Sequence, residues 1–96
     1  MIYKFNDPKN TACFVCNHVF NKERPILYVT HEAEDGLWQF LCGDNDHSHD
    51  DDYKVIALEQ VTAIDESVND LYEMPYGVGA LRDGKLSGWQ PFKLNS

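Results

Sequence analysis

The sequence has little positive charge, since eight lysines and arginines stand against sixteen acids and leave a net charge of −8 over 96 residues. Such a chain is repelled by phosphate backbones, which excludes nucleic acid as an expected partner. Long apolar runs are also missing. The longest, Ala12 to Cys16, is far shorter than the roughly 20 residues that a membrane helix needs. The first ten residues do not resemble a signal peptide, so we expect a cytoplasmic protein that does not bind membranes.

Cysteine is scarce too, with three residues of which two form a close pair. An odd number of cysteines does not fit the disulfide framework of a secreted domain. In a reducing compartment the same residues are expected to be metal ligands or core thiols. The apolar fraction of 43% is high enough for a packed core, and the length suits one domain spanning residues 1–96.

Several segments predict a sheet. Ile26–Glu32 and Leu37–Cys42 are rich in β-branched and aromatic residues and are separated by a turn, which indicates a hairpin. The apolar run Lys54–Leu58 is typical of a buried central strand. The tail indicates a second hairpin around Asp83 and Gly84. We therefore predict a small α+β domain with a mainly antiparallel sheet of two hairpins plus a central strand.

One short helical region is expected from about Leu58 to Glu73, because apolar residues recur there at helical spacing. This stripe consists of Val61, Ile64, Val68 and Leu71. Asp65 is a favoured helix-capping residue, so a short turn followed by a helix from Glu66 to about Glu73 is as compatible with the pattern as one continuous helix. Pro75 ends the helical region.

Two cysteine-containing segments predict a metal site. The Cys13-Phe-Val-Cys16 spacing lets two thiolates reach one tetrahedral ion from a tight turn. Further along the chain, Cys42 is followed by Gly43, which frees the backbone to bend, and by His47, which can return to the ion. We therefore predict that Cys13, Cys16, Cys42 and His47 bind a structural zinc ion.

Other interpretations of these residues stay open. His49 is a rival fourth ligand, and His31 is another because strand alternation places it on the same sheet face as Phe40 and Cys42. A hydrogen-bonded sheet histidine is the simpler role for His31. The cysteines also fit plain core thiols, or a thiol-dependent enzyme or redox protein. Calcium is disfavoured, because His49 stands where an EF-hand loop requires glycine.

The segments "DGLWQFLCG", "KVIALEQV", "IDESVNDLYEMPYGVGALRD" and the late "GW" carry a resemblance to a known family. From about Thr11 to Trp89 the chain resembles small bacterial domains of unknown function, and related sequences are grouped with immunity proteins of polymorphic toxin systems. Where such proteins often show "LPxGxxAxR", this chain has Met74 to Arg82. The resemblance implies a small α+β domain. It also implies a shared cysteine pair and "CG…H" segment, matched here by Cys13, Cys16, Cys42, Gly43 and His47.

Two classes of function follow from these observations. The first is a non-catalytic binding module whose acidic surface occludes a basic protein partner such as a toxin. Its candidate aromatic anchors are Trp38, Tyr72, Tyr76 and Trp89, although core packing is the favoured role of both tryptophans. The alternative is a thiol-dependent enzyme or redox protein that uses Cys13, Cys16 or Cys42.

Overall fold

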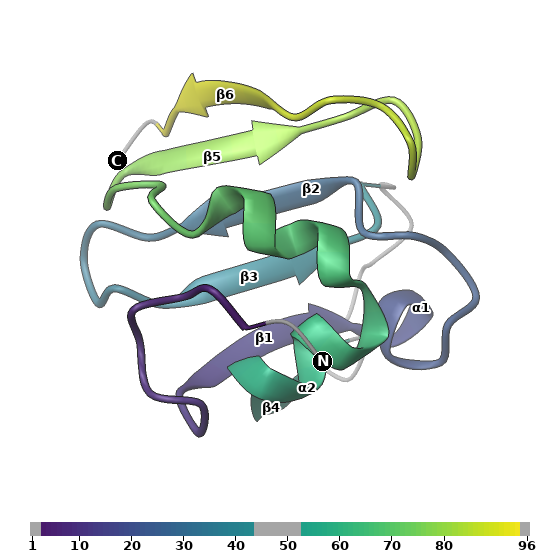
Figure 1. Ribbon diagram of the computed structural model, residues 1–96, viewed down its shortest axis with the longest axis horizontal. Helices are drawn as coiled ribbons and strands as arrows, with labels where there is room; N and C mark the ends of the chain where they lie inside the picture. Colours follow the sequence, from purple (N-terminus) through teal and green to yellow (C-terminus); the bar gives the residue numbers. More distant parts are fainter. Residues whose placement is uncertain (1–2, 44–52, 95–96) are drawn as a thin grey trace.

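The computed structural model describes residues 3–43 and 53–94, and within these ranges six strands form one mixed sheet (Figure 1). The strand order across the sheet is β4-β1-β3-β2-β5-β6. The elements along the chain are β1 (Ala12–Cys16), α1 (Asn17–Phe20), β2 (Tyr28–His31), β3 (Trp38–Leu41), β4 (Tyr53–Ala57), α2 (Leu58–Ile64), the 3-10 helix η2 (Glu66–Leu71), β5 (Val78–Leu81) and β6 (Gln90–Lys93). The predicted α+β class is confirmed.

Both predicted hairpins are present. β2 pairs antiparallel with β3, and β5 pairs antiparallel with β6. In the first hairpin His31 lies opposite Trp38, so its side chain is on the same face as Trp38 and Phe40, as strand alternation predicts. β2 also pairs with β5, which joins the two hairpins into one continuous sheet.

The sheet is mainly antiparallel, but the prediction of two hairpins plus a central strand from Lys54 to Leu58 is wrong in two respects. β1 is an additional strand, and it runs parallel to β3. β4 lies at the edge of the sheet, where its only partner within the described residues is β1. Val55 and Ile56 are neighbours in the apolar run of β4, but their side chains point to opposite faces of the sheet. Val55 is 59% exposed, so the run does not reflect burial on both sides.

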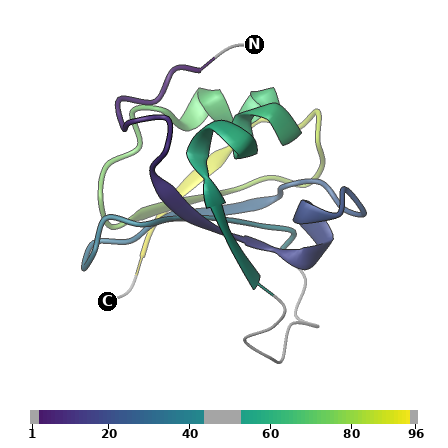
Figure 2. The same ribbon diagram turned by 90° about the horizontal axis from the view of Figure 1, so that it is seen from below.

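The helical region consists of two pieces that cover one face of the sheet (Figures 1 and 2). α2 buries Leu58 and Val61, and η2 buries Val68 and Leu71. Asp65 separates them in an extended conformation, and its carboxylate accepts a hydrogen bond of 3.0 Å from the backbone N–H of Ser67. The predicted capping by Asp65 is therefore confirmed. No helix in the described ranges is long and apolar enough to cross a membrane.

The segment before β1 lies on the same face as α2 and η2 (Figure 2). Phe5 packs edge-on against Trp38, with ring centroids 5.1 Å apart. The indole N–H of Trp38 donates a 2.7 Å hydrogen bond to Asp7, and the backbone N–H of Lys4 donates to Asn69. These contacts complete the core between the sheet and the helices.

A buried ion pair joins η2 to the sheet. The Arg82 guanidinium lies 2.9 Å from the Asp65 carboxylate, and the two side chains are only 1% and 6% exposed. Arg82 also donates hydrogen bonds to the carbonyls of Ile26 and Lys85, and it stacks on the ring of Trp89. Arg82 ends the motif that runs from Met74, and Trp89 is the tryptophan of the late "GW". Both therefore have structural roles.

Candidate metal centre

Cys16, His18 and Cys42 come together where two parallel strands end. Cys16 is the last residue of β1, and Cys42 directly follows β3. Because β1 and β3 run in the same direction, their carboxyl ends meet at one edge of the sheet. The chain turns into α1 at this edge, and the second residue of the helix is His18. The fold thus brings two sulfurs and one imidazole to a single point.

The separations suit a tetrahedral ion. The ligand atoms of the three residues all lie within 4.8 Å of one another, and the Nδ1 atom of His18 is 3.7 Å from the Cys42 sulfur. Tetrahedral zinc, with its usual bond lengths, holds a sulfur and a nitrogen ligand about 3.6 Å apart and two sulfurs about 3.8 Å apart. Cys16 and Cys42 are buried, while His18 is partly exposed. The group can therefore hold a metal ion with little rearrangement.

Hydrogen-bond donors surround the sulfurs. Burial raises the pKa of the Cys16 thiol, while the backbone N–H groups of Val19 and Cys42 act in the opposite direction by bonding to its sulfur. Arg24 places its Nη1 atom 3.4 Å from His18 Nδ1 and 4.0 Å from the Cys42 sulfur. Such donors stabilise thiolates once a metal has displaced their protons.

Cys13, a predicted ligand, is not part of this group. The prediction placed Cys13 and Cys16 in a tight turn, but both lie in the extended strand β1. Side chains three positions apart in a strand point to opposite faces, which separates the two sulfurs. The Cys13 thiol instead donates a 3.3 Å hydrogen bond to the carbonyl of Ile56 on the neighbouring strand β4.

The predicted histidine ligands have different outcomes. His31 is not part of the group. Its Nδ1 atom lies 2.8 Å from the carbonyl oxygen of Met74, and its ring stacks on Trp38 with centroids 3.8 Å apart. A carbonyl only accepts, so Nδ1 must carry the proton. His31 is thus the hydrogen-bonded sheet histidine of the simpler interpretation. His47 and His49 lie outside the described residues.

His18 is the member of this group that sequence reasoning missed. It follows Cys16 by two positions, a spacing that does not by itself predict a pair of metal ligands in a strand or in a helix. At a strand-to-helix junction the same spacing brings the two side chains together, because Cys16 is the N-cap and His18 lies in the first turn of the helix. A helix start directly after "CFVC" was therefore the missing signal.

The thiol of Cys13 has a measurable titration behaviour. Complete burial raises its pKa from 9.0 to about 12. The folded protein keeps this proton at pH values at which the unfolded chain loses it. The contribution of Cys13 to the free energy of unfolding is therefore complete below about pH 9 and is lost as the pH rises toward 12. Between pH 8 and 10 we expect a loss of about 1 kcal/mol in the free energy of unfolding.

Urea denaturation at the two pH values measures this loss, and the Cys13→Ala variant is the control. The variant should lose about 1 kcal/mol less between pH 8 and 10 than the unmodified chain, since only the Cys13 contribution is removed. Equal pH dependence of the two proteins would contradict the assignment. The raised pKa values of Cys13 and Cys16 also disfavour both thiols as nucleophiles.

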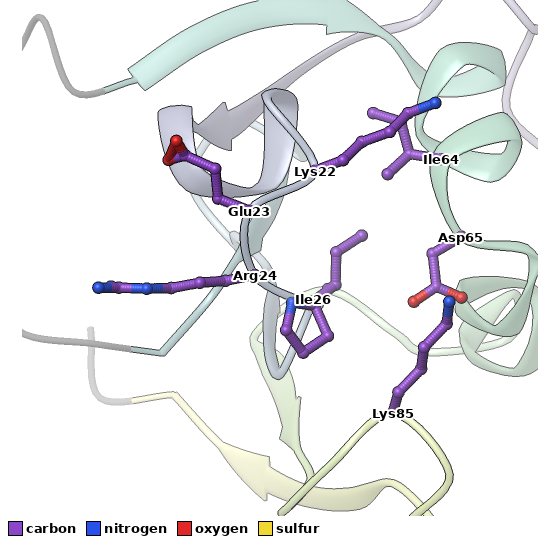
Figure 3. A pocket seen from close by; sticks show the side chains of 8 residues that line it. Lys22, Glu23, Arg24, Ile26, Ile64, Asp65 and Lys85 are labelled. Carbon is purple, nitrogen blue, oxygen red and sulfur yellow. The ribbon is translucent and has the colours of Figure 1, made fainter.

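A hollow of about 340 Å³ lies between the loop that follows α1 and the carboxyl end of α2 (Figure 3). Ile26, Ile64 and Asp65 contribute to its lining, while the side chain of Arg24 extends away from it. The Asp65 carboxylate is already paired with Arg82. The hollow therefore reflects the packing around this ion pair, and we assign no ligand to it.

The four predicted aromatic anchors differ in exposure. Trp38 is 1% exposed and belongs to the core, which is the role favoured for it by the sequence, so it is not a surface anchor. The aromatic-rich pattern of β3 did not reveal that residues 3–11 cover this strand. Trp89 is partly buried against Arg82. Tyr72 and Tyr76 are 38% and 66% exposed and remain available to a partner.

Together these features define a small α+β domain with a cluster of two thiols and one imidazole at a sheet edge. The family model of the immunity protein Imm33 domain matches residues 13–92. The chain therefore belongs to the Imm33 immunity protein domain family, and the resemblance to immunity proteins is confirmed. No curated protein and no solved structure matches it.

Proposed function

We propose that this chain is an immunity protein that neutralises a basic toxin by binding it, without catalysing a reaction. The observation that carries the proposal is its membership of the Imm33 family over residues 13–92. Immunity proteins bind toxins in general, and a net charge of −8 favours the encounter with a basic partner. The raised pKa of two of the three thiols supports a binding role over thiol chemistry.

The proposal includes a structural zinc ion held by Cys16, His18 and Cys42. Thiolate and imidazole ligands favour zinc among the common divalent ions, and the burial of both sulfurs suits a structural rather than a catalytic centre. His47, five positions after Cys42, remains the proposed fourth ligand. The ion would fix the ends of β1 and β3 to the start of α1, and so would stabilise this end of the sheet.

Co-expression tests the proposed function. Each polypeptide encoded by the genes adjacent to this one is produced in a bacterial host with and without the chain. We expect one of them to arrest growth alone and to be tolerated in the presence of the chain. The purified pair should form a complex whose dissociation constant rises with salt, because the attraction between opposite charges is screened. If the chain protects against none of these polypeptides and binds none, the proposal is wrong.

A further inference from the structure

The sheet face opposite the helices has an unusual composition. Strand register places alternate residues of each strand on this open face, and none of them is charged. The open face consists of Ala12, Phe14, Cys16, Tyr28, Thr30, Gln39, Leu41, Tyr53, Val55, Ala57, Gly79, Leu81, Gln90 and Phe92. In the whole chain one residue in four is charged. A sheet face that only meets water normally carries polar and charged side chains, so this composition indicates a contact surface.

Several large apolar side chains of the open face are accessible. Val55, Leu81 and Tyr53 are 59%, 38% and 36% exposed. The rings of Tyr28 and Phe92 pack together, with centroids 5.5 Å apart. α2, η2 and the segment before β1 all lie on the other side of the sheet (Figure 2). Within the described part of the chain, the open face therefore presents an apolar patch that runs from β4 to β6.

An acidic hollow adjoins this face at one end of the sheet. It has a volume of about 840 Å³, and its lining includes Glu32, Glu34, Tyr76, Lys93 and Phe92. Phe92 belongs to both the hollow and the open face, so the two surfaces are continuous. Two carboxylates against one ammonium, beside an exposed tyrosine ring, form a site that favours an arginine or lysine side chain.

We propose that the open face and the acidic hollow together form the docking surface for the basic toxin, an inference that rests on the proposed function. The apolar patch would bury the centre of the interface, and the hollow would receive a basic side chain of the toxin. Charge selects this occupant over a second copy of the chain. Two copies would bring net charges of −8 together, whereas a basic toxin is attracted.

A matched pair of leucine substitutions tests the docking surface. Leu81 lies on the open face, while Leu86 is 99% exposed in the loop between β5 and β6, outside the face. With the toxin found by co-expression, Leu81→Lys should raise the dissociation constant by about thirtyfold or more, because it places a positive charge on the apolar face opposite a basic partner. Leu86→Lys adds the same charge and should change it by less than about threefold.

A second pair tests the hollow and guards against misfolding. Glu34→Lys reverses one carboxylate of the hollow, and Glu66→Lys reverses an exposed acid on η2, over the other face of the sheet. Only Glu34→Lys should weaken binding more than about tenfold. Circular dichroism and urea denaturation must show that each variant is folded.

The outcomes separate the two proposals. If the toxin binds all four variants like the unmodified chain, the docking surface is wrong and the proposed function stands. If no toxin is bound at all, both are wrong. If Leu81→Lys instead dissolves a homodimer, as measured by analytical ultracentrifugation, the open face pairs with a second copy and the inference is overturned.

Discussion

The Cys16→Ser variant is expected to lose the proposed zinc ion and more than about 4 kcal/mol of its free energy of unfolding. Serine cannot replace a thiolate in a tetrahedral zinc site. The group formed by Cys16, His18 and Cys42 has two sulfurs, and the proposed ion needs both of them. Structural zinc contributes an apparent ~10–16 kcal/mol in small peptides, which is comparable to the stability of a whole domain. Elemental analysis and urea denaturation of protein purified without chelator measure both effects.

Cys13→Ser is the matched control, because Cys13 and Cys16 are both fully buried and lie in the same strand. Its zinc content should equal that of the unmodified chain, and chelator should lower its stability by as much as it lowers that of the unmodified chain. Cys16→Ser should be insensitive to chelator, because it no longer holds a metal ion. Zinc retained by Cys16→Ser, or lost from Cys13→Ser, would contradict the assigned ligands.

The second large effect is expected at the buried ion pair. Arg82→Met should lower the free energy of unfolding by about 3–5 kcal/mol, because it leaves the Asp65 carboxylate buried without its cation. The substitution also removes hydrogen bonds to the carbonyls of Ile26 and Lys85. Equilibrium denaturation in urea measures the change. The neighbouring variant Lys85→Met removes an exposed cation and should stay within about 0.5 kcal/mol of the unmodified chain.

A double variant identifies the cause of this loss. When Asp65→Asn is combined with Arg82→Met, no unpaired charge remains, so the double variant should be less destabilised than the sum of the single ones. Additive losses would show that Asp65 and Arg82 stabilise the fold independently. A loss below about 1 kcal/mol in Arg82→Met would show that the ion pair contributes little.

Local sequence patterns predicted the features that depend on near neighbours. The hairpin of β2 and β3, the parity that places His31 on the face of Trp38, and the interruption at Asp65 all follow from residues close in sequence. Turn residues, strand alternation and capping preferences act over a few positions, and the chain obeys them. The resemblance also located the Met74–Arg82 motif, although not the partners of Arg82.

The remaining features depend on contacts between distant segments. The parallel pairing of β1 with β3 joins residues about 25 positions apart, and no short pattern specifies it. "CFVC" fits a metal-binding turn and a strand equally well, and only its pairing with two strands decides between them. The same pairing places the Cys13 side chain away from Cys16 and Cys42, and it places His18 beside them.

The position of β1 between β3 and β4 has a consequence for how the protein is made. Both strands that flank β1 follow it in the sequence, so the sheet cannot assemble in the order of translation. β1 keeps at least one bare edge until residue 57 has emerged. A polypeptide that ends before residue 53 would expose that edge, and unpaired strand edges recruit other chains into aggregates. Pairing of both edges of β1 therefore requires translation to continue through β4.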